Sequence, residues 1–158
     1  FGPRESLPYF IPEVIRQCLK ENVIKVGNLR ASRDFTYVDD MTDAMIAALE
    51  ISNIEGEIIN IGTSKPWKME DLLRLIKKET CTEKKDVVLD KSRLGPDDVK
   101  MLVADSKKAR NILGWKPQTT FKEGIQKPLN GTVTTKKCGD TRNTAGNGAT
   151  DSCTSSSH

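Results

Sequence analysis

The stretch Arg33-Asp34-Phe35-Thr36-Tyr37-Val38-Asp39-Asp40, followed directly by a small, apolar segment, decides how the rest of this sequence is interpreted. Its aromatic and β-branched residues favour an extended strand. Asp40 is a short side chain with an oxygen acceptor at the point where helical spacing begins. The stretch therefore predicts a strand, an N-cap at Asp40 and a helix from Met41 to about residue 51.

Arg33 lies at the entrance of this predicted strand. Its planar, permanently charged guanidinium group matches a phosphate or a carboxylate, which makes Arg33 the first candidate for a ligand contact. An ion pair with Asp34, Asp39 or Asp40 explains the same residue equally well. Spacing alone does not separate the two interpretations.

Composition indicates one ordinary globular domain. The chain has 158 residues, of which 36% are hydrophobic and 30% charged, and this is enough for a single core. The net charge of +3 is mild, and the lysines are spread along the chain among a comparable number of acidic residues. We therefore expect a solvated surface and no nucleic-acid partner, all the more because few aromatic residues are present to stack on bases.

Several classes of protein are excluded by what the sequence lacks. No apolar run approaches the ~20 residues of a membrane span, and the start does not resemble a signal peptide, so we expect a cytoplasmic protein without a membrane partner. The cysteines form no CxxC pair, and the only histidine is His158. These facts argue against a zinc or other metal site of the usual spacing and against a histidine base.

Apolar periodicity predicts helices that alternate with short strands, which implies an α/β arrangement. Amphipathic helices are expected over residues 10–19 and 69–76, and strands over residues 23–26, 87–89 and 101–104.

A further strand is predicted for residues 57–62, where an apolar run stopped by glycine is typical of a strand buried on both faces. Asn60 is the exception inside it. A buried amide must satisfy both its donor and its acceptor, so Asn60 either braces a loop or contacts the edge of a ligand.

Capping signals mark the last two helices. Asp105-Ser106 precedes one that Gly114 closes, and Thr120 with Glu123 makes a capping box for a final helix that Pro128 ends. Residues 130–158 then contain mainly Gly, Thr, Ser, Asn and Lys. We expect a folded part over residues 1–129 and a disordered low-complexity tail over 130–158.

Several short motifs follow one another along residues 1 to about 126, and each is weak evidence alone. They are Phe1-Gly2-Pro3-Arg4, Ile11-Pro12, Gly27-Asn28-Leu29, the stretch Arg33 to Asp40, Asn60-Ile61-Gly62, Ala104-Asp105-Ser106-Lys107-Lys108-Ala109, Leu113-Gly114-Trp115-Lys116-Pro117 and Glu123-Gly124-Ile125.

In this order and spacing the motifs resemble the C-terminal half of the extended short-chain dehydrogenase/reductase family, the NAD-dependent nucleotide-sugar epimerases and dehydratases. The GDP-mannose 4,6-dehydratase-like branch is the most similar. A tyrosine is usual in the family where this chain has Phe1. The resemblance implies the C-terminal part of a Rossmann-like doubly wound fold plus the small substrate-binding subdomain. It also implies a nucleotide-sugar substrate and, for the intact enzyme, NAD or NADP and a homodimer.

The resemblance also implies roles for single residues. Arg33 falls on the arginine that contacts the nucleotide diphosphate, and Asn60 on a position near the base or ribose. The loop around Ile11 and Pro12 falls on the wall of the base pocket. Trp115 we expect to pack under the last helix rather than to stack on a base.

A second diphosphate arginine normally precedes the proline of an Arg-Pro-Gly-Asp-like loop, where this chain has Gly95 before Pro96. Arg93, two residues earlier, is the candidate for this contact from a displaced position, and the displacement changes the geometry of a bidentate contact. A surface position is the alternative.

The catalytic elements of the family do not occur in the sequence. It has no Gly-x-x-Gly-x-x-Gly motif, and the residues four after Tyr9 and Tyr37 are Glu13 and Met41 instead of lysine. We therefore expect the substrate-binding portion of such an enzyme, beginning after the catalytic half, with no catalytic residue, no bound cofactor and no activity by itself. The competing hypothesis is a non-catalytic module that binds nucleotide sugars or another protein.

Overall fold

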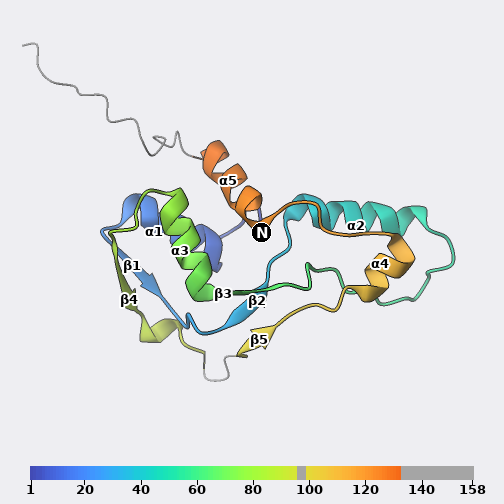
Figure 1. Cartoon of the computed structure of the whole chain (residues 1–158), viewed down its shortest axis with the longest axis horizontal. Helices are drawn as coiled ribbons and strands as arrows, with labels where there is room; N and C mark the ends of the chain where they lie inside the picture. Colours follow the sequence, from blue (N-terminus) through green and yellow to red (C-terminus); the bar gives the residue numbers. More distant parts are fainter. Residues whose placement is uncertain (96–98, 133–158) are drawn as a thin grey trace, which may run out of the picture.

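The computed structural model describes residues 1–95 and 99–132, which form a mixed α/β arrangement of helices around short strands (Figure 1). The elements are α1 (Phe10–Lys20), β1 (Val23–Val26), β2 (Ser32–Asp34), α2 (Val38–Glu50), β3 (Pro66–Lys68), α3 (Met69–Glu79), β4 (Asp86–Leu89), the 3-10 helix η1 (Lys91–Arg93), β5 (Met101–Leu102), α4 (Lys107–Leu113) and α5 (Phe121–Thr132).

The strands form two small sheets. β1 pairs in parallel with β4, with Val26 opposite Leu89. In the other sheet β2 is central, antiparallel to β3 and parallel to β5, so that Arg33 lies between Trp67 and Leu102. Two parallel pairings among so few strands agree with the α/β arrangement that the sequence predicts.

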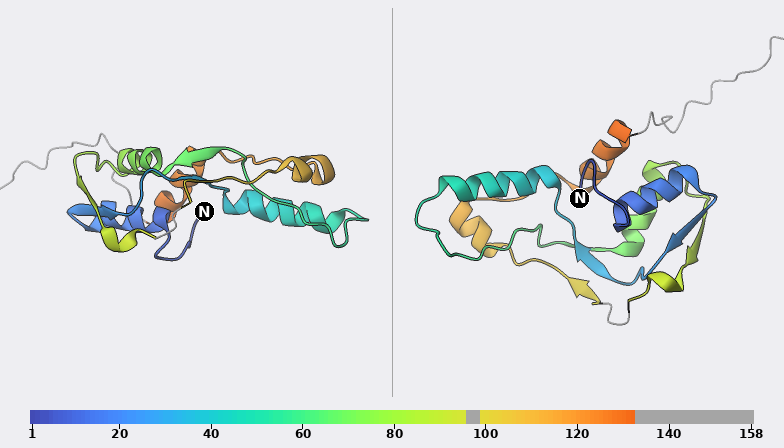
Figure 2. Two further views of the ribbon diagram at one scale, coloured as in Figure 1. Left: turned by 90° about the horizontal axis from the view of Figure 1, so that it is seen from below. Right: turned by 180° about the vertical axis from the view of Figure 1, so that it is seen from behind.

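Two lobes lie at opposite ends of the molecule, with β2, β3 and β5 between them, and Figure 2 shows the same separation from below and behind. The first lobe contains α1, β1, α3 and β4. Its core is built by the amphipathic faces of α1 and α3, which meet over β1, as their helical apolar spacing predicts. Val14, Ile24, Leu72 and Ile76 are almost completely buried there.

The second lobe contains α2, α4 and the segment 57–62. Its smaller core is made by Ala44, Ala109, Leu113 and Trp115. The Trp115 Nε1–H donates to the main-chain carbonyl of Asp40 at 2.8 Å. Trp115 is thus a packing residue, but it packs with α2 and α4 and not under the last helix as expected.

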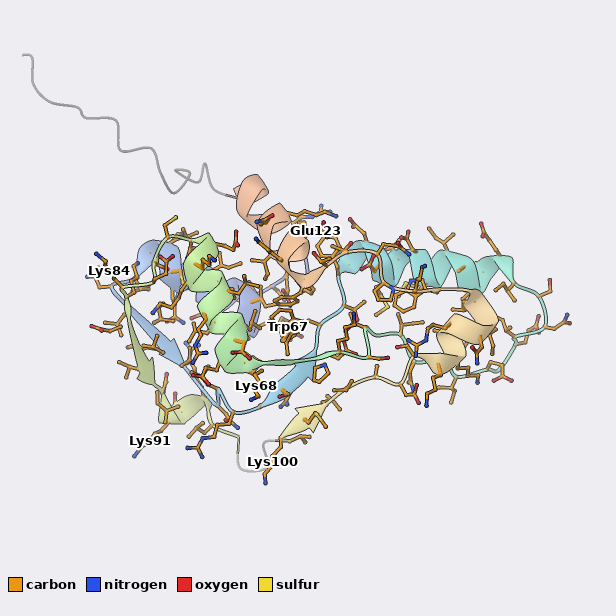
Figure 3. The ribbon with its side chains drawn as sticks, in the orientation of Figure 1. Trp67, Lys68, Lys84, Lys91, Lys100 and Glu123 are labelled. Carbon is orange, nitrogen blue, oxygen red and sulfur yellow. The ribbon has the colours of Figure 1, made fainter. Side chains whose placement is uncertain are left out.

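An aromatic cluster joins the middle of the molecule to the start of α5. The ring of Phe121 lies 4.6 Å from that of Trp67 and 4.9 Å from that of Phe1, measured between centroids. Figure 3 shows Trp67 below the first turn of α5, where Glu123 lies. Offset and tilted contacts of this kind favour a fixed mutual orientation of the rings.

The predicted boundary inside the opening stretch is wrong. The strand ends at Asp34 and the helix begins at Val38 after an extended Tyr37, so Asp40 lies in the first turn of α2 and is not its N-cap. The reason is that the Asp40 carboxylate serves a different segment. It accepts hydrogen bonds from the main-chain N–H groups of Gln118 and Thr119 at 3.1 to 3.2 Å.

The strand predicted for residues 57–62 is also absent. Ile58 and Asn60 are exposed, whereas Ile59 and Ile61 pack on the second-lobe core. The segment is covered on one face only, and no described residue pairs with it as a neighbouring strand. A strand requires such a neighbour for its hydrogen bonds.

Most of the remaining predictions hold, although the strand predicted for residues 101–104 ends at Leu102. β1, the helices over 10–20 and 69–79 and the Gly114 stop (φ 60°) are confirmed. The capping box is confirmed, because the Glu123 carboxylate accepts from the Thr120 N–H at 2.9 Å. α5 continues through Pro128 to Thr132, so the predicted end of that helix is wrong. A proline removes one helical hydrogen bond without necessarily ending the helix.

The rest of the predicted tail, residues 133–158, lies outside the described residues. No helix in the described part of the chain has the length and apolar character that crossing a membrane requires.

Candidate functional site

A cavity of about 430 Å³ opens in the first lobe, where the start of α1, the end of β1 and η1 converge. This volume suits a small-molecule ligand. The lining combines apolar side chains with charged and amide side chains. Its residues are Pro8, Phe10, Glu13, Val14, Lys25, Val26, Gly27, Asn28 and Arg93.

Glu13 is the buried charge of this cavity. Its carboxylate accepts from Arg16 through Nε and Nη2 at 3.0 Å each, from Gln17 Nε2 at 2.8 Å and from Arg93 Nη2 at 3.2 Å. The hydrogen bond from Arg16, with that from Arg93, lowers the pKa of Glu13 from 4.5 to about 2. Glu13 is therefore an anion at neutral pH and attracts Arg93 to the cavity.

Arg93 is held at the cavity wall from two sides. Besides Glu13, its guanidinium donates through Nε to Asp90 at 3.3 Å. Asp90 also accepts from the Ser92 N–H at 3.0 Å, and hydrogen bonds from Ser92 lower the pKa of Asp90. These contacts use two of the five N–H donors of Arg93, which leaves others for an anionic ligand.

Gly27 allows the chain of Arg93 to approach β1. A Cβ atom at Gly27 would lie 2.8 Å from the Arg93 carbonyl oxygen, closer than side-chain atoms pack. Gln17 fixes the neighbouring strand, because its amide donates to the Lys25 carbonyl at 3.1 Å and accepts from the Lys25 N–H at 2.6 Å. The cavity is thus held by side-chain hydrogen bonds between α1, β1 and η1.

Arg33 lies in the central sheet. Its Nη1 donates to the carbonyl of Ser32 at 2.9 Å and to that of Val99 at 2.7 Å. The three aspartates considered as its partners all have other contacts. Asp39 lies 3.6 Å from Lys127, Asp40 accepts from residues 118 and 119, and Asp34 accepts from the loop described next.

Asp34 organises the loop beside Asn60. Its carboxylate accepts from the N–H groups of Thr63 at 3.0 Å, Ser64 at 2.9 Å and Ala104 at 3.3 Å, and from the Thr63 hydroxyl. Gly62 permits this close packing, since a Cβ atom there would lie 2.7 Å from Asp34 Oδ2. One carboxylate thereby connects β2 to the chain segments around Thr63 and around Ala104.

The structure brings only one of the sequence-predicted site residues, Arg93, into the cavity. Ile11 is buried in the first-lobe core with 3% of its surface exposed. Pro12 lies beside it in the first turn of α1, so these two residues belong to a helix and not to the expected loop. Asn60 is exposed in the second lobe, and Arg33 lies on β2. Their ligand roles stay predictions.

Sequence reasoning missed Glu13. The available signal was the spacing of Glu13, Arg16 and Gln17, which places three polar side chains at i, i+3 and i+4 of an amphipathic helix. That spacing is usually interpreted as a solvated face. Only the approach of η1 shows that Glu13 is covered by Arg93.

Comparison with known proteins establishes the family. The model of the GDP-mannose 4,6 dehydratase family matches residues 2–128. The chain belongs to this family. The match confirms the resemblance that the motifs indicate.

Relatives of the chain include several epimerases. A putative UDP-glucose 4-epimerase of Methanocaldococcus jannaschii is 36% identical over 129 residues, which are 82% of this chain and 39% of the relative. The crystal structure of a UDP-glucose 4-epimerase with UDP-glucose from Thermotoga maritima superposes with a TM-score of 0.72 at 27% identity, covering 82% of this chain and 42% of that one.

A UDP-glucuronic acid 4-epimerase from Bacillus cereus, in complex with UDP-glucuronic acid and NAD, superposes with a TM-score of 0.74 at 28% identity, covering 82% of this chain and 41% of that one. These likenesses confirm the Rossmann-like α/β class. The chain spans about two fifths of the length of the proteins that it matches.

The sequence contains neither a Gly-x-x-Gly-x-x-Gly turn nor a lysine four residues after a tyrosine. Such a turn would place a pyrophosphate at a helix N-terminus. Tyr37 is 2% exposed, and burial raises the pKa of its hydroxyl, whereas a proton-transferring tyrosine requires a pKa nearer the working pH. Lys127 lies over the face of the Tyr37 ring, 4.4 Å from its centroid.

Proposed function

We propose that this chain is the nucleotide-sugar-binding portion of an NAD- or NADP-dependent nucleotide-sugar epimerase or 4,6-dehydratase. The observation that carries the proposal is the cavity at the end of β1, with Arg93 at its wall. Family membership gives the class of reaction, and the cavity gives a place for the substrate. The intact enzyme, in the cytoplasm and as a homodimer, performs the redox chemistry with groups that this chain does not contain.

The chemistry of the cavity suits a nucleotide. Pro8 and Phe10 offer apolar surface for the face of a base, and the Asn28 amide offers hydrogen bonds for its edge. Arg93 is a permanently charged partner for a phosphate. Arg33 approaches the same chain segment from the central sheet, because its guanidinium bonds the carbonyl of Val99, six residues beyond Arg93.

Calorimetric titration of the full chain with UDP-, GDP- and dTDP-sugars tests the proposal. UDP-glucose and UDP-glucuronic acid, which two of the solved relatives hold, are the first ligands to try. We expect binding selective for one nucleotide and weakened about 10- to 100-fold in Arg93→Ala and Arg33→Ala, since each removes a charge-assisted hydrogen bond. Lys91→Ala, a change of equal charge in the same 3-10 helix but outside the cavity, serves as the matched control.

The absence of binding to a chain shown to be folded by circular dichroism would contradict the proposal and favour the alternative, a protein-interaction module. That alternative is supported by the missing catalytic motifs. The purified chain alone is expected to show no turnover of nucleotide sugar with added NAD. Turnover by the chain alone would overturn the view that the catalytic half lies elsewhere.

Binding to nucleic acid is the weakest rival. Figure 3 shows Lys84, Lys91 and Lys100 at separate places on the periphery. A nucleic-acid complex would lose affinity steeply as salt is raised. Titration with an oligonucleotide at two salt concentrations is expected to show no such binding.

A further inference from the structure

Two carboxylates from different parts of the chain hold the Arg93 side chain. Its Nη2 donates to Glu13 Oε1 on α1 at 3.2 Å, and its Nε donates to Asp90 Oδ2 at 3.3 Å. Glu13 lies 80 residues away in the sequence, whereas Asp90 is the residue before η1. A planar guanidinium group that is bonded through two of its nitrogens keeps one orientation. The remaining nitrogen, Nη1, donates to no residue that the structure describes.

Glu13 is itself fixed by groups other than Arg93. Its side chain is 9% exposed, and its carboxylate accepts two hydrogen bonds from Arg16 and one from Gln17. Gln17 in turn bonds the main chain of Lys25 on β1 through both ends of its amide. The acceptor of Arg93 therefore belongs to a network that joins α1 to β1. A buried polar network whose members are bonded holds its side chains rigidly.

We propose that Glu13 is a positioning residue, which orders the Arg93 guanidinium at the cavity wall before a phosphate group of the ligand arrives. A mobile arginine loses its rotamer freedom when a ligand binds, and this loss lowers affinity. In this chain the ordering takes place on folding, through the ion pair with Glu13. Asp90 fixes Arg93 only to its own short segment, because the two residues are three positions apart. The inference rests on the proposed function, which supplies the phosphate.

A second effect of Glu13 acts in the opposite direction. Its negative charge repels an anionic ligand, and Glu13→Gln would make the net charge beside the cavity more positive by one. The charges of Glu13 and Asp90 balance those of Arg16 and Arg93 in the native chain. Charge alone therefore predicts tighter binding in Glu13→Gln, whereas positioning of Arg93 predicts weaker binding. The sign of the change in affinity distinguishes the two effects.

Calorimetric titration of the full chain with UDP-glucose and with the other UDP-, GDP- and dTDP-sugars measures this sign. We expect Glu13→Gln to weaken binding about 2- to 10-fold, which corresponds to the ordering of one long side chain on binding. In an Arg93→Ala background the same substitution should not weaken binding, because no guanidinium remains to be positioned. Glu21→Gln is the matched control and should leave affinity unchanged. It removes another carboxylate that bonds Arg16, outside the cavity lining.

NMR relaxation of arginine side chains separates positioning from a general loss of stability. In the ligand-free native chain, the Nε–H group of Arg93 should be nearly as ordered as the backbone of α1. Arg30 is the mobile reference, because it is exposed and its guanidinium bonds no described residue. In Glu13→Gln we expect the order of Arg93 to fall toward that of Arg30. The comparison within the native chain tests the proposal even if this variant does not fold.

Three results would overturn the inference and leave the proposed function intact. The first is a nucleotide sugar whose binding Glu13→Gln leaves unchanged or strengthens. The second is an equal loss of affinity from Glu13→Gln in the native and Arg93→Ala backgrounds, which would assign a general structural role to Glu13. The third is an Arg93 side chain as mobile as that of Arg30 in the native chain. A folded chain that binds none of the nucleotide sugars would contradict the proposed function and the inference together.

Discussion

The two lobes of this protein start from similar sequence patterns and reach different degrees of burial. In the first lobe, Leu72 on α3 and Ile24 on β1 have no exposed surface. In the second, α2 and residues 57–61 also carry apolar side chains, yet Leu49 and Ile58 lie almost fully in solvent. The difference is one of partners, because α1 and α3 cover each other and β1, whereas α2 has α4 on one side only.

The comparison teaches that an apolar pattern specifies which face of an element should be covered, but not which element covers it. Where the covering element is adjacent in the same chain, pattern and burial agree. Where it is not among the described residues, the same pattern produces an exposed surface.

A pair of leucine truncations tests this difference most directly and has the largest expected effect. Leu72→Ala removes a completely buried side chain and should lower the free energy of unfolding by about 2–5 kcal/mol. Leu49→Ala removes an exposed one and should change it by less than about 0.5 kcal/mol. Urea denaturation of the full chain measures both. Equal effects would mean that α2 is covered in solution.

Glu13, the buried carboxylate of the first lobe, gives a prediction that depends on pH, with an effect on the free energy of unfolding similar to that of Leu72→Ala. The pKa of Glu13 is lowered from 4.5 to about 2 in the folded chain. The ionised carboxylate therefore adds to the free energy of unfolding above pH 4.5, and this stabilisation is lost as the pH falls toward 2. It amounts to about 3 kcal/mol at most. Urea denaturation across this range should show the gap between the native chain and Glu13→Gln closing with falling pH. A gap independent of pH would contradict the contacts of Glu13.

Asp40 tests how the second lobe is connected to the rest of the chain. Asp40→Ala leaves the N–H groups of Gln118 and Thr119 without their acceptor in a partly buried place, and should cost about 2 kcal/mol. Asp39→Ala, one residue earlier and exposed, loses only a surface ion pair with Lys127 and should cost less than about 0.5 kcal/mol. Equal melting temperatures of the two variants would show that the Asp40 carboxylate does not hold residues 118 and 119 to α2.

The smallest expected effect concerns the joint between the central sheet and the second lobe. In Gly62→Ala the new Cβ atom would lie 2.5 Å from the Ala104 Cβ atom and 2.7 Å from Asp34 Oδ2, so the loop must shift, at about 1–2 kcal/mol. In Gly95→Ala no atom of the described residues lies within 4 Å of the new Cβ atom, and the change should be close to neutral. Denaturation curves of the two variants check this contrast. A neutral Gly62→Ala would show that the loop at Gly62 can shift away from Asp34 and Ala104 at little cost in free energy.

Most of the local structure could be predicted from the sequence, and the site could be predicted only in part. The bounds of β1, the two amphipathic helices and the capping box follow from residues close in the chain. Arg93 was singled out by the resemblance, but its partner Glu13 was not, since 80 residues separate them. Asp40 was predicted to cap its own helix, whereas it bonds a segment 78 residues away. Long-range partners of polar side chains leave no local signal.

What the sequence determined by itself was the family, through the order of its motifs, and the positions of helices and short strands, through periodicity and capping, which act over a few residues. What only the tertiary structure decided was which polar groups meet in the cavity at the end of β1, and that residues 57–61 form no strand. The physical reason is the same in both cases. Pairing and burial depend on groups that are distant in the chain. A local sequence pattern predicts that a segment needs a partner, but it does not predict which segment provides that partner.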